Sequence, residues 1–261
     1  LPVQRERHTQ WPVIPGSTLK GILRDAVREK VKEKYPAQEE KRDENGAIEV
    51  AKRTSRQVAN EDDPGLVAAF GPGKINVPDQ AHAGALNLTD ARILAFPVRS
   101  LKGVFAWVTC PAVLERMERD LKLTGDINGL TFTSPKQDEA LCQKESPLLI
   151  NEGAAKKLVL EEFEFTRTGE ISHIIKQGSE KEDLSTWIAG RVFATDDTFT
   201  PNRFKDHFVV LHDDDFNHFV RHATEVVARI ALDYERKTVK KGALFYEEFL
   251  PAETLFYSVV F

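Results

Sequence analysis

The sequence predicts an α+β fold built on an antiparallel sheet. Segments with a strand pattern and segments with helical spacing are intermixed without strict alternation, which disfavours a doubly wound parallel sheet. The 261 residues are 41% hydrophobic, which is enough to bury a substantial core. The apolar runs stay well short of the ~20 residues that a membrane span needs, so we expect no membrane partner.

The first expected element is a helix that starts near Ser17, directly after a Pro-Gly turn. Ser17 or Thr18 can cap it, and Lys20 and Arg24 follow one turn apart on one side. A helix N-terminus attracts phosphate, so Ser17, Lys20 and Arg24 predict a site for a phosphate backbone. The alternative is an ordinary amphipathic helix with solvated cations. Its apolar face would consist of Leu19, Ile22 and Leu23.

The next segments alternate between charged and apolar composition. Residues 30–63 are dense in charged side chains, so we expect an exposed insertion that is partly helical or disordered. A short buried segment at 65–73 ends in a Gly/Pro turn, and the alternation within 83–96 predicts a strand that leads into a loop. The strongest strand pattern lies at 104–109, and Pro111 ends it.

The second half of the chain contains a further insertion and a hairpin. A helix is expected at 112–121, and the mixed turn signals of 122–151 predict a second insertion. Two segments flank the basic stretch 236–242 and predict a β-hairpin whose tip carries Lys237 and Lys240. The other expected elements are strands at 158–165, 208–212, 226–233 and 255–261, helices at 184–192 and 214–224, and the two hairpin strands, 229–235 and 243–248.

Charge and cysteine content restrict the classes of partner and compartment. The net charge of −5 excludes a uniformly basic surface, so any contact with nucleic acid must be a local stripe. Cys110 and Cys142 are the only cysteines and form no CxxC pair, which fits a reducing compartment. We therefore expect a cytoplasmic protein. The first residue is Leu1 and not Met, so we also expect that the natural chain begins further upstream.

Two further groups of basic residues could contact phosphates. Arg99, Ser100 and Lys102 follow a turn and precede a buried strand, which repeats the arrangement near Ser17. Two such clusters in one acidic chain favour a phosphate backbone that passes both. Upstream, Arg5, Arg7 and His8 form a smaller cluster, in which His8 is also a candidate for acid–base catalysis.

Common catalytic signatures are absent, namely GxSxG, HExxH, the Walker motif and GxGxxG. Glu247 and Glu248 are candidate catalytic residues, because a carboxylate beside bound phosphate can hold a divalent cation or take a proton. An exposed Glu pair is more often merely solvated. The His and Asp residues of 212–222 have metal-like composition, but no third convergent ligand can be placed. We interpret the aspartates of that segment as a helix cap.

Five stretches together carry a family pattern. They are VQRERHT at 3–9, PGSTLKGILR at 15–24, AGALNLTDAR at 83–92, FPVRSLKGVFAWVTCP at 96–111 and GALFYEEFLPAETLFY at 242–257. The second stretch resembles the hallmark of the RAMP superfamily of CRISPR effector proteins, a glycine turn followed by a Ser-x-Leu-Lys-Gly-x-Leu-Arg-like helix start. The combination is similar to the backbone subunits of type III-B, or Cmr, complexes.

The resemblance implies a single RRM-like, ferredoxin-like domain over 1–261 with insertions and a β-hairpin thumb. It implies that copies of the chain stack along a guide RNA (crRNA) as a helical filament with other Cmr subunits. Each copy would hold guide phosphates without regard to sequence, while the guide pairs with target RNA. The thumb would wedge into this duplex and flip a nucleotide at regular intervals. We expect its tip at 233–242, with 122–151 and 169–183 as alternatives.

The resemblance also implies cleavage of target RNA beside each flipped position with a divalent metal, which we expect to be Mg²⁺. In this family the essential aspartate precedes the Pro-Val-Gln-Arg-Glu motif, and an upstream histidine contributes; neither position exists in this sequence. Glu247 matches the supporting acidic position of the family, whereas Phe249 stands where an aromatic hydroxyl is often found. The alternatives are a non-catalytic crRNA-binding subunit and the related backbone subunit of type III-A complexes.

Overall fold

The computed structural model describes residues 2–46, 48–73, 81–125, 127–131, 133–152, 155–171, 173–175, 180–240 and 242–261. These residues form two compact units. The larger unit consists of Leu1–Val13 and Arg92–Tyr257, and the smaller unit consists of Ile14–Ala91 and Ser258–Phe261. Strand β1 (Val13–Ile14) lies where the chain passes from one unit to the other. The expected insertions and the alternative thumb segment 169–183 fall partly outside the described residues.

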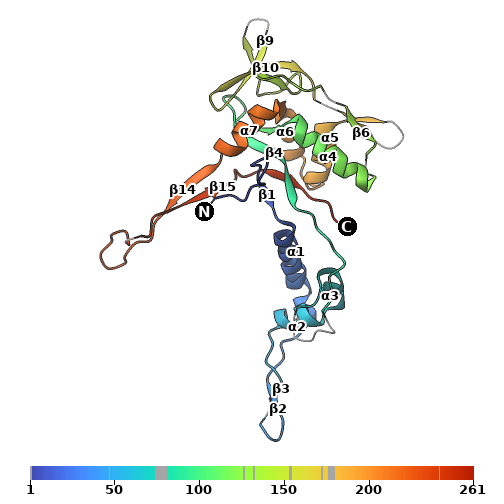
Figure 1. Ribbon diagram of the computed structural model, residues 1–261, viewed down its shortest axis with the longest axis vertical. Helices are drawn as coiled ribbons and strands as arrows, with labels where there is room; N and C mark the ends of the chain where they lie inside the picture. The colour runs from blue at the N-terminus through green and yellow to red at the C-terminus, as the bar shows by residue number, and fades with distance from the viewer. Residues whose placement is uncertain are drawn as a thin grey trace. The chain divides into compact units, whose positions relative to one another are not determined.

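A mixed sheet organises the larger unit (Figure 1). Its strands are β4 (Ala91–Arg99), β5 (Phe105–Thr109), β7 (Glu139–Leu141), β8 (Ile150–Glu152), β9 (Ala155–Leu160), β10 (Phe163–Gly169), β13 (Phe208–Leu211) and β16 (Leu255–Tyr257). Together with β1 they lie in the order β1-β4-β5-β13-β7-β10-β9-β8, and β16 also pairs with β4. The α+β prediction is confirmed at this level, as a mixed α and β architecture around one large sheet.

The prediction of an antiparallel sheet is wrong for two strand pairs. Strand β13 runs parallel to β5, and β10 runs parallel to β7, whereas β4–β5, β9–β10 and β16–β4 are antiparallel. Parallel neighbours need a crossover connection. The crossover from β5 to β13 contains α4 (Pro111–Thr124), α5 (Leu184–Val192) and α6 (Thr200–His207). Local sequence patterns do not reveal which of two distant strands become neighbours, so the mixed order could not be predicted from them.

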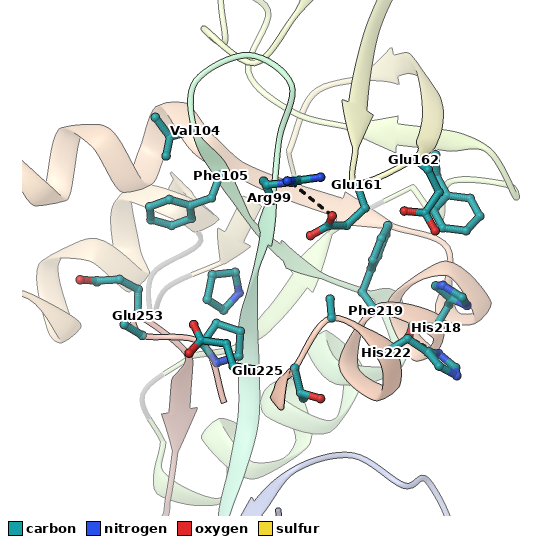
Figure 2. Close-up of a pocket in the computed structure, with 16 residues that line it drawn as sticks. Arg99, Val104, Phe105, Glu161, Glu162, His218, Phe219, His222, Glu225 and Glu253 are labelled. Carbon is teal, nitrogen blue, oxygen red and sulfur yellow. Dashed lines mark hydrogen bonds and ion pairs between the residues drawn. The ribbon is translucent and has the colours of Figure 1, made fainter. Parts of the chain in front are cut away.

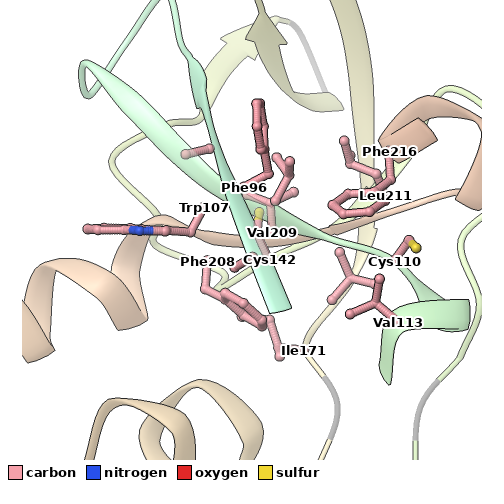
Figure 3. Packing of buried hydrophobic residues seen from close by; sticks show 14 of the residues in the cluster. Phe96, Trp107, Cys110, Val113, Cys142, Ile171, Phe208, Val209, Leu211 and Phe216 are labelled. Carbon is pink, nitrogen blue, oxygen red and sulfur yellow. The ribbon is translucent and has the colours of Figure 1, made fainter. Parts of the chain in front are cut away.

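The core of the larger unit lies along β4, β5 and β13 (Figure 3). Phe96, Trp107 and Phe208 from these three strands are each at most 1% exposed. Helices α4 and α7 (Asp213–His222) add further apolar side chains to the same cluster. Cys110 and Cys142 lie in it as free thiols, and burial raises the pKa of Cys142 to about 11. Both thiols are therefore packing residues.

Three segments differ from their expected structure. Residues 81–90 form no regular strand, and the strand expected within 83–96 begins only at Ala91. The single strand expected at 158–165 is two strands, β9 and β10, joined by a turn at Glu161 with φ of 49°. The segment expected as an insertion at 122–151 contributes β7, which lies between β13 and β10 in the main sheet. Helix α6 had no counterpart among the expected elements.

Two smaller sheets complete the larger unit. Strands β6 (Gly129–Thr131), β11 (His173–Ile175) and β12 (Lys181–Asp183) form one of them. The other is an antiparallel hairpin of β14 (Glu225–Arg229) and β15 (Phe245–Phe249), which extends as a two-stranded ribbon in Figure 1. The expected hairpin strands at 229–235 and 243–248 overlap this ladder only in part, because β14 begins at Glu225 and ends at Arg229, which pairs with Phe245. Beyond the regular strands, Leu232 still bridges to Val239.

The smaller unit is mainly helical. It contains α1 (Gly16–Val31), the short 3₁₀ helix η1 (Lys32–Lys34), β2 (Lys41–Arg42), β3 (Ile48–Val50), α2 (Ser55–Asp62) and α3 (Pro64–Phe70). Thr54 caps α2 through a capping box with Gln57, which explains why a charge-rich segment forms a helix there. None of the helices among the described residues is long and apolar enough to cross a membrane.

Candidate nucleic-acid interface

One exposed cationic candidate is the turn that connects β4 to β5; together with Arg99, the last residue of β4, it spans residues 99–104, which we call the basic loop. The Arg99 side chain is 77% exposed, and Lys102 is also exposed. Ser100, in contrast, is only 7% exposed. The structure therefore presents the two cations of this predicted cluster at the surface and buries the hydroxyl between them.

Backbone hydrogen bonds fix the shape of the basic loop. The Ser100 N–H donates to the Val104 carbonyl at 2.9 Å, and the Leu101 N–H donates to the Val159 carbonyl at 3.0 Å. The Ser100 hydroxyl donates to the same Val159 carbonyl at 3.2 Å, so this residue anchors the loop to β9. Gly103 has φ of 81°, a conformation that favours glycine.

Both cations of the basic loop keep donors available for a ligand. Arg99 Nε lies 3.3 Å from a carboxylate oxygen of Glu161, and Lys102 Nζ donates to the Leu149 carbonyl at 2.8 Å. A guanidinium has five N–H donors and an ammonium has three. Each group can therefore donate to a phosphate while it keeps its contact within the protein.

The predicted cluster at the start of α1 is less available. Lys20 Nζ donates to the Leu86 carbonyl at 2.8 Å, and Arg24 Nε donates to Asn60 Oδ1 at 2.9 Å; both residues are half-buried. Burial, together with repulsion from Arg28, lowers the pKa of Arg24. Ser17 is exposed. Lys20 and Arg24 thus connect α1 to neighbouring segments of the smaller unit.

The N-terminus of α1 is capped differently from the prediction. The helix begins at Gly16 after Pro15, and neither Ser17 nor Thr18 provides a side-chain cap. Instead the Gly16 N–H donates to Asp90 Oδ1 at 2.8 Å. The Asp90 carboxylate thus occupies the positive end of the helix dipole, where we had expected phosphate.

The upstream basic cluster separates into inward and outward residues. Arg5 is 15% exposed at its side chain and donates to Glu248 Oε1 at 2.6 Å and to the Val220 carbonyl at 2.7 Å. Arg7 and His8 are exposed. His8 Nε2 lies 4.0 Å from Glu6, whose carboxylate is bound mainly by Arg116. Arg5 therefore connects the first residues to the rest of the larger unit, and only Arg7 and His8 can reach a ligand.

Glu247 and Glu248 do not converge on one site. They are neighbours on β15, and successive side chains of a strand point to opposite faces. Glu247 accepts from Arg229 Nε at 2.7 Å. Glu248 accepts from the Val3 N–H at 2.9 Å and from the Thr224 hydroxyl at 2.9 Å, in addition to Arg5.

The Glu248 carboxyl is held in its ionised form. Partial burial opposes ionisation, but the hydrogen bonds from Val3, Arg5 and Thr224 outweigh it and lower the pKa of Glu248. A carboxyl with a lowered pKa is a poor general acid near neutral pH. The structure therefore gives Glu248 the contacts of a structural ion pair.

The described residues do not fit a Mg²⁺ site. Among them, no group of three or more His, Cys, Asp or Glu side chains is arranged to hold a metal ion. The 212–222 segment is helix α7 with its N-cap: His212 Nδ1 accepts from the Asp214 N–H at 3.3 Å, so the capping side chain is His212 and not one of the expected aspartates. The rings of His218 and His222 stack with centroids 4.5 Å apart. No catalytic step is assigned to a metal at these residues.

The hairpin tip presents two of the predicted lysines. Lys237 and Lys240 are exposed, and Lys237 Nζ lies 4.3 Å from the centroid of the Tyr234 ring. Asp233 organises the turn, because its carboxylate accepts from the amides of Glu235 and Arg236. The tip is therefore a defined basic turn that carries an exposed aromatic ring.

The structure also forms a cavity that the sequence did not indicate. Its volume is about 610 Å³, and Arg99 of the basic loop lines one side (Figure 2). The aromatic rings of Phe105, Phe163, Phe219 and His218 line it together with four carboxylates, those of Glu161, Glu162, Glu225 and Glu253. These residues come from segments that are distant in the sequence, so no local motif could have identified the cavity.

Comparisons with known proteins show the family. The model of the RAMP superfamily matches residues 1–260. The chain is 36% identical over 259 residues to the CRISPR system Cmr endoribonuclease Cmr4 of Pyrococcus furiosus, which covers 99% of this chain and 72% of the relative. The crystal structure of oligomeric Cmr4 from Pyrococcus furiosus matches with a TM-score of 0.60 and 30% identity, covering 100% of this chain and 74% of that chain.

A more distant structure agrees in fold. The cryo-EM structure of the type III-B Cmr-beta complex bound to cognate target RNA contains a chain that matches with a TM-score of 0.56 and 18% identity. The match covers 100% of this chain and 74% of that one. The resemblance inferred from the five sequence stretches is therefore confirmed. The chain belongs to the RAMP superfamily, as a homologue of the endoribonuclease subunit Cmr4.

Proposed function

We propose that this chain is a crRNA-binding backbone subunit of a type III-B CRISPR complex, and that the basic loop is a principal contact with the guide phosphates. The single observation that carries the proposal is the exposure of Arg99 and Lys102 on a loop whose backbone is fixed by β9. A loop that is already ordered loses little conformational entropy when it binds. The homology to Cmr4 and the Cmr-beta complex with target RNA supports the same conclusion.

Contacts of this kind are independent of sequence. Arg99 can form a bidentate contact with a phosphate, and Lys102 supplies a point charge beside it. Phosphate contacts carry no sequence information, so sequence selection is left to pairing between the guide and its target.

We propose that four other predicted residues also contact the RNA. Arg7, Ser17, Lys237 and Lys240 are exposed and can approach RNA without losing the contacts described above. We assign the β14–β15 hairpin the role of the thumb, which would wedge into the guide–target duplex. The core would then be the RRM-like palm, and further copies of this chain and other Cmr subunits would extend the filament.

The binding proposal is tested with a paired variant and a matched control. Arg99→Ala with Lys102→Ala removes two exposed cations from the basic loop. Arg119→Ala with Lys181→Ala removes two exposed cations elsewhere in the larger unit. For single-stranded RNA the slope of log K against log salt is about −0.7 per phosphate contact, so the loop variant should flatten it by about 1.4. Equal affinities and slopes for both variants would contradict the proposal.

Cleavage of target RNA with Mg²⁺ is the second part of the proposal. Its support is the endoribonuclease name of the Pyrococcus furiosus relative, because the described residues add no metal site. His8→Ala and Glu247→Gln, at the more accessible candidates, are each expected to slow cleavage of a target paired with its guide. A chelator should abolish it. In the full-length protein, which we expect to include the upstream aspartate, cleavage that is absent both with and without Mg²⁺ would favour the alternative, a non-catalytic crRNA-binding subunit.

A further inference from the structure

His207 contacts the basic loop from a buried position. It is the last residue of α6 and is 8% exposed. Its Nε2 lies 3.1 Å from the carbonyl oxygen of Gly103, and its Nδ1 lies 2.9 Å from the carbonyl oxygen of Arg203. The neighbouring residues Phe204 and Phe208 are fully buried, so the end of α6 is a rigid support for the ring.

The contact falls at a constrained point of the loop, where Gly103 and the following Val104 both have positive φ. Gly103 has φ of 81°, and a Cβ on it would lie 2.9 Å from Leu148 Cδ2 and 3.1 Å from His207 Nε2. The Gly103 carbonyl also accepts from the Phe105 N–H at 3.0 Å, where β5 begins. His207 and β5 therefore hold the same carbonyl, and this fixes the direction in which the chain leaves the loop.

We infer that His207 is a positioning residue for the basic loop: a hydrogen bond from its Nε2 to Gly103 fixes the loop in the shape that presents Arg99 and Lys102. A carbonyl oxygen only accepts, so this bond requires a proton on Nε2. The inference deepens the proposed function, and it rests on that function only for the consequence to RNA binding. The shape of the loop itself can be measured without RNA.

Two amide variants, each of which places a nitrogen near one of the ring nitrogens, separate the two contacts. In His207→Gln the amide nitrogen reaches about as far as Nε2 and can still donate to Gly103. In His207→Asn the amide nitrogen stands near Nδ1 and can reach only Arg203. Both variants place a neutral amide in the same pocket, so a difference between them reports on the contact with Gly103 and not on polarity.

The first measurement is hydrogen exchange at the amides of Ser100 and Leu101 in the full chain. One net hydrogen bond corresponds to about a 2- to 12-fold change in a local opening equilibrium. His207→Asn should accelerate exchange at both amides by such a factor, and His207→Gln should keep it near the wild-type rate. Equal exchange in the two variants, or wild-type exchange in His207→Asn, overturns the inference.

The second measurement uses the unmodified protein, so it does not depend on the folding of any variant. A ¹⁵N–¹H correlation spectrum of the His207 ring should show a proton on Nε2. A ring that carries its only proton on Nδ1 overturns the inference.

The third measurement is the affinity for single-stranded RNA. His207→Asn should weaken it several-fold and His207→Gln should restore it. If exchange responds as expected but neither His207→Asn nor the Arg99 and Lys102 variant changes RNA affinity, the positioning of the loop is supported and its proposed RNA-binding function is overturned.

Discussion

Replacing Glu248 by Gln should destabilise the larger unit through a defined set of contacts. The carboxylate accepts hydrogen bonds from Arg5, from the Val3 amide and from the Thr224 hydroxyl, and it is 18% exposed. Hydrogen bonds to charged groups contribute about 1.5–3 kcal/mol. The variant leaves the Arg5 guanidinium without a counter-charge in a site where Arg5 itself is 15% exposed. We expect a loss of about 2 kcal/mol in the free energy of unfolding.

Thermal melting measures this loss directly. For a domain of this size 1 kcal/mol lowers the melting temperature by roughly 2–4 °C, so Glu248→Gln should lower it by about 4–8 °C. Glu247→Gln is the matched control on the same strand. Its partner Arg229 is 53% exposed, and exposed pairs contribute at most about 1 kcal/mol, or roughly 2–4 °C.

The pH dependence gives a second, independent test. The pKa of Glu248 is lower in the folded chain than the ordinary value, so its contribution to stability is present above the unfolded pKa of about 4.3. It is lost as pH falls through the folded pKa. The melting temperatures of wild type and Glu248→Gln should therefore converge in acid. The reasoning is refuted if both glutamate variants melt alike, or if Glu248→Gln abolishes cleavage while its stability is unchanged.

Three other outcomes can be checked on the full chain by melting and by alkylation. Gly84→Ala should lower the melting temperature, because its Cβ would clash with backbone atoms at the end of α3. In Gly21→Ala, within α1, the new Cβ meets no atom within 4 Å, so this variant should stabilise the protein by about 0.5–1 kcal/mol. Tyr257→Phe removes a 3.0 Å hydrogen bond to the Asp120 carboxylate and should cost about 1.5–3 kcal/mol. Cys142 has a pKa of about 11, so roughly a thousandth of its thiol is ionised at pH 8. It should therefore resist iodoacetamide until the protein unfolds. Rapid alkylation of the native chain would contradict its burial.

Local sequence signals located several of the longer elements of the fold. The helix after the Pro-Gly turn, strand β5 with its terminating proline, and helices α5 and α7 lie within a few residues of the expected positions. Each has a periodic apolar pattern or a turn residue at its boundary. The parallel placement of β13 beside β5 has no such signal, because it is decided by packing between segments about a hundred residues apart.

In the candidate site too, some properties of the residues follow from the local sequence, and others depend on tertiary contacts. Exposure of Arg99 and Lys102 agrees with the expectation of a surface cluster. Arg5 has the same charge, yet its partner Glu248 is 243 residues away, so its burial could not be foreseen. His207 has no motif around it, and its contact with Gly103 depends on where α6 ends. Residue type alone predicted charge, but tertiary partners decided which charges remain available.

The ion pair between Arg5 and Glu248 also sets an order of events during synthesis. The two residues are 243 positions apart, and at about 5–20 residues per second the ribosome adds Glu248 roughly 12–50 s after Arg5. Strand β4 can likewise pair with β16 only after the ribosome has added β16, in which Tyr257 is the partner of Arg92. Arg5 therefore cannot pair with Glu248, nor β4 with β16, until most of this chain has been made, and during that interval Arg5 lacks this counter-charge.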